Sequence, residues 1–269
     1  MSEHAGRVAL VTGGSSGIGR AVAGVLAREG ASVAVGAPAL DEARAAADEI
    51  AAEGGTAIGV AADVRDGAAL AAAADQAAHE FGGLDVLVTS AGIQRYGTVT
   101  GTSEERWDEV FAVNVKGVYL AARAALPYLR RSASGAVVVV SSVQAHAAQS
   151  GVAAYAASKG ALSALVRSMA VDEAGHGVRV NAVCPGSVDT PMLRASAALF
   201  SDGSPQAVQD TVQGWGRSHP LARVARPAEV AEVVSSLAGE RASFVTGEDV
   251  RVDGGLLAAL AVQAPAAQS

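Results

Sequence analysis

A phenol and an ammonium group lie four residues apart in the segment Tyr155-Ala156-Ala157-Ser158-Lys159. On a helix, this spacing places both side chains on one face, within reach of one bound molecule. An isolated tyrosine holds its proton up to about pH 10, and a nearby cation lowers that pKa by favouring the phenolate. The pair therefore predicts proton transfer at Tyr155, with Lys159 lowering the pKa of the phenol.

A hydroxyl precedes this pair at Ser142, directly after the valine-rich run 137–141. Ligands of open α/β sheets bind at the carboxyl ends of the strands, so the Ser142 hydroxyl is placed to polarise a substrate oxygen. Ser141 is the alternative, because a slip of one residue in the strand would turn its side chain toward the site instead.

A glycine-rich turn, Thr12-Gly13-Gly14-Ser15-Ser16-Gly17-Ile18-Gly19, follows the first strand-like run and precedes a helical pattern. Gly13 and Gly17 let the backbone approach a pyrophosphate, and Gly19 lets the helix pack close to the sheet. Ser15 and Ser16 add hydroxyl donors. A turn without a ligand is the alternative, but together with the Tyr155 and Lys159 pair the turn indicates hydride transfer with a dinucleotide.

Short valine-rich runs alternate with amphipathic helical segments along the whole chain. This alternation predicts one α/β domain, 1–269, with a parallel sheet covered by helices on both faces. The strands are expected at 8–11, 33–35, 57–61, 86–88, 137–140, 178–183 and 249–252. The helices are expected at 17–29, 40–53, 66–81, 103–130, 153–174 and 227–237, the fourth being long enough to hold two helices broken near Asn114.

The segment 190–220 departs from this rhythm and contains Phe200 and Trp215 without a clear strand. Such a long insertion predicts a substrate lid, and the alternative is a helical hairpin that packs on the sheet without closing over anything. The tail 262–269 is expected to be a frayed end.

Composition narrows the functional classes. The net charge is -7 and no basic cluster occurs, which argues against nucleic-acid and anionic-membrane partners. No signal peptide or spanning apolar run occurs, which predicts a cytoplasmic protein. The single cysteine, Cys184, excludes an internal disulfide. It is expected to be a small buried residue, with a catalytic thiol as the alternative, and no metal site is expected.

The motifs quoted above, with Asn114, Ser90-Ala91-Gly92, Pro185-Gly186 and the terminal Val252-Asp253-Gly254-Gly255, resemble those of the classical short-chain dehydrogenases/reductases in order and spacing. The resemblance runs from about residue 7 to residue 255. It implies a single Rossmann-type, doubly wound parallel sheet of about seven strands, most often assembled as a homotetramer.

The resemblance also implies the roles of the catalytic residues. Tyr155 is the general acid/base of a secondary alcohol and ketone interconversion, Lys159 supplies charge and holds the nicotinamide ribose, and Ser142 polarises the substrate oxygen. Asn114 is similar to a family asparagine whose backbone opens a kink for a water leading to the lysine. A buried asparagine with all its hydrogen bonds satisfied is the alternative.

Cofactor contacts are implied along the same edge of the sheet. They are Gly13, Ser15, Ser16, Gly17, Ile18, Gly19, Ala37, Asp63, Val64, Ser90, Ala91, Gly92, Tyr155, Lys159, Pro185, Gly186, Val188 and Thr190. Thr89-Ser90 replaces the family's asparagine pair, so a side-chain amide that ties the central strand to its neighbour is lost, and reduced rigidity is expected.

The choice between NAD and NADP depends on the end of the second strand, where an acid binds the ribose hydroxyls or a base binds the extra phosphate. Ala37 offers neither, and Ser16 stands where NADP-preferring relatives often carry a basic residue. NAD is therefore favoured, with NADP open because Arg44 could reach the phosphate.

The substrate is expected to be a small alcohol or ketone, contacted by Gln94, Gln144 and His146 beyond the catalytic loops, and for His146 a partly exposed loop histidine is the alternative. One alternative is an acyl-carrier-linked ketoreductase, for which Arg95, Arg194 and Arg217 are the candidate docking cations. The other is a nucleotide-binding regulator that kept the fold and lost turnover.

Overall fold

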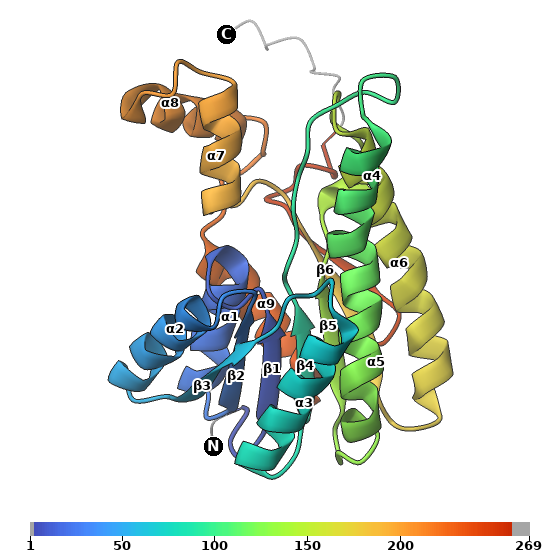
Figure 1. The fold of residues 1–269 in the computed structure, drawn as a ribbon. Helices are drawn as coiled ribbons and strands as arrows, with labels where there is room; N and C mark the ends of the chain where they lie inside the picture. Colours follow the sequence, from blue (N-terminus) through green and yellow to red (C-terminus); the bar gives the residue numbers. More distant parts are fainter. Residues whose placement is uncertain (1–2, 260–269) are drawn as a thin grey trace, which may run out of the picture.

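Seven parallel strands form one sheet in the order β3-β2-β1-β4-β5-β6-β7 (Figure 1). The structure, a computed structural model, describes residues 3–259, so the tail 262–269 lies outside the described residues. The strands are β1 (Val8–Thr12), β2 (Ser32–Ala37), β3 (Thr56–Ala61), β4 (Val86–Thr89), β5 (Ala136–Val140), β6 (Arg179–Pro185) and β7 (Asp249–Val252). The predicted doubly wound parallel sheet is confirmed.

Helices cover both faces of the sheet because its strands are apolar on both sides. In β1, Leu10 belongs to one buried cluster and Val11 to the other. The first cluster includes residues of α3 (Gly67–Phe81), α5 (Gly117–Leu129) and α6 (Ala153–Ala174). The second includes residues of α1 (Gly17–Arg28), α2 (Leu40–Ala52) and α9 (Pro227–Ala238). Within residues 3–259, no helix is both long and apolar enough to span a bilayer.

The expected break near Asn114 is a π-helical turn rather than an interruption. Helix α4 (Glu104–Phe111) runs directly into the turn Ala112–Lys116, which runs directly into α5. A π turn adds one residue to the helical repeat and shifts the backbone hydrogen bonds by one position. It therefore rotates Asn114 relative to the flanking helices without ending them.

The segment after β6 forms a helical hairpin, α7 (Pro191–Leu199) and α8 (Pro205–Gly216). Proline opens each helix, and the Thr190 and Ser204 hydroxyls accept hydrogen bonds from backbone amides of the respective first turns. Figure 1 shows the hairpin standing beyond the carboxyl ends of the strands. Phe200, at its tip, packs edge-on against Tyr96 and Trp215.

Candidate active site

The backbone of the glycine turn between β1 and α1 can approach a bound phosphate closely. Gly13 and Gly17 have φ angles of 66° and 53°, which glycine adopts without strain. A Cβ atom at Gly19 would lie 2.1 Å from the Gly13 carbonyl oxygen, so only glycine fits there. A Cβ atom at Gly13 would lie 2.6 Å from the Ala91 amide nitrogen. The turn thus packs directly on the loop after β4.

The start of α1 has donors to offer an anion. Ser16 is the N-cap residue, yet its side chain makes no capping hydrogen bond and is exposed. The first amides of a helix point along its axis and attract negative charge. A Cβ atom at Gly17 would lie 3.4 Å from Thr190 Cγ2, which places the segment after β6 beside this turn. These residues fit a dinucleotide pyrophosphate.

The sheet reverses its strand order beside β1, which pairs with both β2 and β4. The Ser90 amide donates to the Thr12 carbonyl oxygen at 3.1 Å, so backbone alone joins the two strand ends here. Thr12 and Thr89 are register partners. Both hydroxyls are buried without a hydrogen-bond partner in the described chain. The asparagine that the resemblance implies here would supply a side-chain amide between the two strands, and Thr89 does not supply one.

Ser142 and Tyr155 form the centre of the site. The Ser142 hydroxyl accepts a hydrogen bond from the Gln144 amide at 3.1 Å, which caps the short turn Val143–Ala145. The same hydroxyl lies near the Tyr155 phenol and favours its ionised form. The Ser141 hydroxyl instead lies 3.5 Å from the Lys159 carbonyl oxygen. Of the two serines, Ser142 is the one that acts on the pKa of Tyr155.

The expected lowering of the Tyr155 pKa by Lys159 is wrong for this structure. Burial raises the pKa of Tyr155 to about 12 and outweighs the opposite effect of the nearby Ser142 hydroxyl. Burial also lowers the pKa of Lys159 to about 8, although the nearby Cys184 opposes that shift. The Lys159 Nζ atom donates to the Val140 carbonyl oxygen at 3.0 Å and lies 5.5 Å from the centroid of the Tyr155 ring. Loss of water therefore dominates both pKa values.

Asn114 is fully buried and uses its whole amide. Its Oδ1 accepts from the Ile93 amide at 2.8 Å, and its Nδ2 donates to the Ile93 carbonyl oxygen at 2.9 Å and to the Ser158 hydroxyl at 3.0 Å. A Cβ atom at Gly92 would lie 3.5 Å from Asn114 Oδ1 and 3.8 Å from Lys159 Nζ. The π turn thus brings Asn114 beside the lysine and locks the loop after β4 to α6.

A cavity of about 460 Å³ opens beside the catalytic pair. Its lining includes several of the predicted cofactor and substrate contacts, namely Ile18, Pro185, Gly186, Val188, Thr190, Gln94 and Gln144. Helices α7 and α8 supply another wall through Met192, Leu193 and Trp215. His146 is absent from this lining and lies 3.4 Å from Asp249 instead. The geometry brings Gln94 and Gln144 to Tyr155 but leaves His146 apart.

The predicted adenine-side contacts lie away from this cavity. Ala37 is fully buried at the end of β2, and Val64 is 6% exposed. The Asp63 carboxylate is bound by the Arg65 guanidinium at 2.6 Å, a hydrogen bond that lowers the pKa of Asp63. The negative charge of Asp63 is therefore already paired with Arg65.

His219 was not singled out by its sequence pattern, yet it joins the hairpin to the segment after β6. Its Nε2 accepts from the Ser187 amide at 3.1 Å, and its Nδ1 lies 3.2 Å from the Trp215 carbonyl oxygen. A Cβ atom at Gly186 would lie 2.7 Å from the same Nε2. The ring therefore fits because Gly186 has no side chain. Tyr96 and Ser187 also line the cavity without having been predicted.

Comparison with known proteins identifies a matching family model and several similar sequences. A family model described as enoyl-(acyl carrier protein) reductase matches residues 13–257. The chain is 42% identical to a cis-4-hydroxycyclohexanecarboxylate dehydrogenase of Sinomonas cyclohexanicum, with 94% of this chain and 97% of that protein covered. It is 39% identical to the oxidoreductase UcpA of Salmonella typhimurium, with 95% and 96% covered.

Among solved structures, the ligand-free aldohexose dehydrogenase AldT of Thermoplasma acidophilum superposes with a TM-score of 0.90 at 36% identity. The match covers 98% of this chain and 99% of that one. The likeness therefore extends over the hairpin and the cavity as well as the sheet.

Proposed function

The chain belongs to the classical short-chain dehydrogenase/reductase family and is an oxidoreductase, and from this we propose that it interconverts a secondary alcohol and a ketone with a nicotinamide dinucleotide. The observation that carries the proposal is that Ser142 and Tyr155 lie together on the wall of a cavity that also reaches Ile18 and Thr190 beside the glycine turn. Acid/base, substrate and cofactor positions thus meet in one space.

A nicotinamide dinucleotide held by the glycine turn and by the segment after β6 would supply the hydride on reduction and take it up on oxidation. Ser142 holds the substrate oxygen, and Tyr155 gives its proton to that oxygen on reduction or takes it on oxidation. The phenol holds its proton at neutral pH, as an unperturbed tyrosine does, and burial raises its pKa further, to about 12, which suits a proton donor. The Lys159 Nζ atom lies 5.5 Å from the centroid of the Tyr155 ring, and Asn114 fixes the helix and loop on either side of the lysine.

The substrate is proposed to be an uncharged, amphipathic alcohol or ketone of modest size. In the described chain, no residue lining the cavity is Asp, Glu, Lys or Arg. A charged substrate group would lose its hydrating water in this cavity without gaining a partner. This loss costs on the order of 2–7 kcal/mol for a neutral polar group and more for a charged one. Gln94 and Gln144 provide neutral hydrogen-bonding groups, and Met192, Leu193 and Trp215 provide apolar surface.

NAD is proposed as the cofactor. The extra phosphate of NADP needs a cation at the end of β2, where Ala37 is buried. Arg20, near the start of α1, is paired with Glu49 at 2.9 Å. Near Ser16 and Ala37 the extra phosphate of NADP would therefore find no free cation. The exposed Arg44 of α2 is the alternative contact, and a test must address it.

The test is absorbance at the reduced-nicotinamide band with a panel of neutral secondary alcohols, polyols, sugars and ketones, each with NAD or NADP and their reduced forms. Turnover should fall by about 10²- to 10⁴-fold in Tyr155→Phe, because general acid/base catalysis contributes that much. Cofactor affinity should persist. Undiminished turnover in Tyr155→Phe would refute the acid/base role, and cofactor binding without any turnover would favour the idle regulator.

An acyl-carrier-linked reductase is the second candidate, favoured by the description of the matching family model. Two of its three candidate docking arginines are already paired: Arg95 with Glu109 at 2.7 Å, and Arg194 with Asp189 through bonds of 2.7 and 2.8 Å. Reversing the charge of two of the three, Arg194 and Arg217, should weaken carrier-dependent reduction alone if a carrier docks here. Equal losses with a small ketone would reject docking.

Two further properties are proposed on the same basis. The hairpin α7–α8 acts as a lid, which predicts that a substrate analogue changes the fluorescence of Trp215, and Trp215→Phe should remove that change. The chain assembles as a homotetramer, which sedimentation of the purified protein tests directly. An unchanged Trp215 signal at saturating analogue, or a monomer in sedimentation, would reject the respective proposal.

A further inference from the structure

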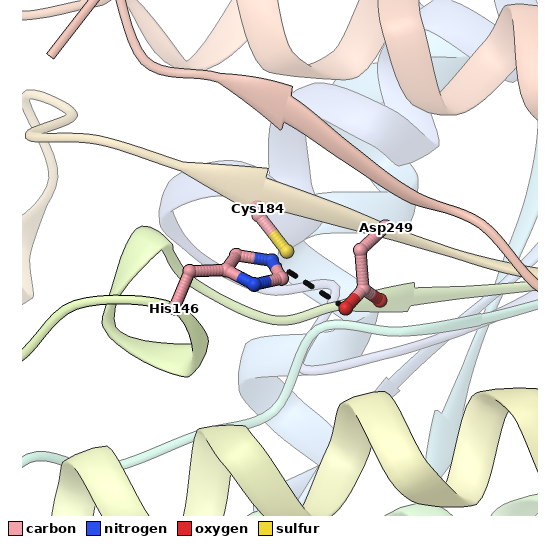
Figure 2. Close-up of side chains that lie close together, drawn as sticks. All are labelled: His146, Cys184 and Asp249. Carbon is pink, nitrogen blue, oxygen red and sulfur yellow. Dashed lines mark ion pairs between the residues drawn. The ribbon is translucent and has the colours of Figure 1, made fainter. Parts of the chain in front are cut away.

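Three side chains with metal-binding groups meet behind the catalytic loop, on segments far apart in the sequence. His146 follows the turn after β5, Cys184 lies on β6, and Asp249 begins β7 (Figure 2). Their ligating nitrogen, sulfur and oxygen atoms all lie within 4.8 Å of one another. Figure 2 shows the imidazole directed between the sulfur and the carboxylate.

The distances are close to those of a bound cation. Zinc bonds are about 2.0–2.1 Å to nitrogen or oxygen and about 2.3 Å to sulfur, so tetrahedral ligands lie roughly 3.3–3.6 Å apart. His146 Nε2 and Asp249 Oδ2 are already 3.4 Å apart. From a largest separation of 4.8 Å, closing the third position needs a movement of roughly 1 Å. His146 can make it because it lies on a partly exposed loop.

Without a cation, the Asp249 carboxylate and the Cys184 sulfur make fewer interactions than they are able to make. Asp249 Oδ1 is buried and has no hydrogen-bond partner within the described residues. Cys184 is fully buried, and the Ser141 hydroxyl and the Ser142 amide lie near its sulfur. A cation bound between the three groups would satisfy Asp249 Oδ1 and favour the thiolate form of Cys184.

We propose that His146, Cys184 and Asp249 bind one divalent transition-metal ion, with zinc the preferred ion and a water molecule in the fourth position. Thiolate and imidazole ligands select zinc over magnesium or calcium, which prefer all-oxygen sites. Two anionic ligands balance the charge of the ion. The partly exposed imidazole gives the ion a path from solvent and leaves room for the water.

The site is separate from the reaction cavity, whose lining includes none of the three ligands. It lies against the loop that carries Ser142, because the Ser142 amide is near the Cys184 sulfur. The ion would join β7, the last strand of the sheet, to that loop. The expected effect is therefore a gain in stability, and the proposal is independent of the proposed reaction.

The experiment uses the full-length, tag-free protein, stripped with a chelator that is then removed. Cobalt(II) serves as the spectroscopic probe, because a tetrahedral site gives visible d–d bands and a thiolate ligand adds a charge-transfer band in the near ultraviolet. Zinc affinity and stoichiometry are measured by calorimetry, and the shift of the melting temperature by zinc is recorded. We expect one ion per chain, the thiolate band with cobalt, and a raised melting temperature with zinc.

His146→Gln, Cys184→Ser and Asp249→Asn should each weaken zinc binding by at least about tenfold, and Cys184→Ser should lose the thiolate band. His79→Gln, an exposed histidine on α3, is the matched control and should bind as the unsubstituted protein does. His146→Gln changes a partly exposed loop side chain, so it tests the site even if a core variant unfolds. Absence of zinc binding, or full affinity in any folded variant of the three, overturns the proposal.

Discussion

Thr12 and Thr89 stand opposite each other on β1 and β4, and each hydroxyl is buried without a hydrogen-bond partner in the part of the chain that the structure describes. A buried hydroxyl without a partner costs about 1–3 kcal/mol relative to a satisfied one. The two threonines lie at the strand ends that flank the glycine turn. The centre of the sheet is therefore less stable than its packing alone would make it.

Thr89→Val is expected to stabilise the protein. Valine has nearly the same shape, and removing the orphaned hydroxyl removes its desolvation cost, so the free energy of unfolding should rise by about 1 kcal/mol. Thr89→Asn is expected to stabilise by a similar amount if its amide reaches the Thr12 hydroxyl. Urea denaturation measures both changes.

Thr56→Val, on the exposed start of β3, is the control and should change the free energy of unfolding by less than about 0.5 kcal/mol. Destabilisation by Thr89→Val would show that the hydroxyl has a partner in solution, such as an ordered water molecule.

Lys159→Met is expected to stabilise the cofactor-free protein at neutral pH while abolishing turnover. Burial lowers the pKa of Lys159 from 10.5 to about 8. The unfolded chain therefore binds more protons between these values, and the stability of the unsubstituted protein rises with pH across that window. The shift corresponds to roughly 3 kcal/mol, which is an upper limit on the gain in Lys159→Met below about pH 8.

The gain should shrink toward zero as the pH approaches about 10, where the lysine is neutral in the folded protein. Raising the pKa of Tyr155 to about 12 lowers stability above pH 10 in both proteins alike, so that contribution cancels. The exposed Lys116→Met is the control, with an expected difference that does not vary with pH. A pH-independent gain in Lys159→Met would reject the lowered pKa of Lys159.

Gly19→Ala is expected to destabilise the protein by about 2–3 kcal/mol and to abolish cofactor binding, because the added Cβ meets the Gly13 carbonyl oxygen at 2.1 Å. Gly24→Ala, on the same helix, is the matched control. Its Cβ meets only the mobile end of Arg20 at 3.3 Å, and it should stabilise by up to about 1 kcal/mol. Chemical denaturation and fluorescence titration with reduced NAD separate the two. Equal behaviour of both variants would contradict the close approach of turn and helix.

Ser16→Arg is expected to move cofactor preference toward NADP. A guanidinium at this exposed position would pair with the extra phosphate, and a charge-assisted hydrogen bond is worth about 1.5–3 kcal/mol. The ratio of kcat/KM for NADP to that for NAD should rise by about tenfold or more. Ser16→Glu should change the ratio in the opposite sense. If neither variant alters the ratio while Arg44→Ala does, the phosphate lies on α2 instead.

Local sequence patterns were enough to predict the strands of the sheet and the glycine turn. The seven strand-like runs are all strands of the sheet. In the five inner strands almost every residue is buried, which is why their sequences are nearly continuous apolar runs. The positions of Gly13, Gly17 and Gly19 also marked the turn, since positive φ angles and close backbone contacts restrict the choice to glycine.

Properties that depend on distant neighbours were not predictable. The π turn at Asn114 relies on hydrogen bonds to Ile93 and Ser158, which no local periodicity reports. The direction of the Tyr155 pKa was wrong because spacing reveals the cation and not the burial. His146 was assigned to the substrate because the sequence did not show that β7 would bring Asp249 to it.

His219 holds the Ser187 amide with one ring nitrogen and faces the Trp215 carbonyl oxygen with the other. His219 therefore links the start of the segment after β6 to the end of α8. A cofactor that orders the first should preshape the cavity wall formed by the second. The consequence is kinetic: we expect an ordered mechanism in which the dinucleotide binds before the alcohol or ketone and leaves after it.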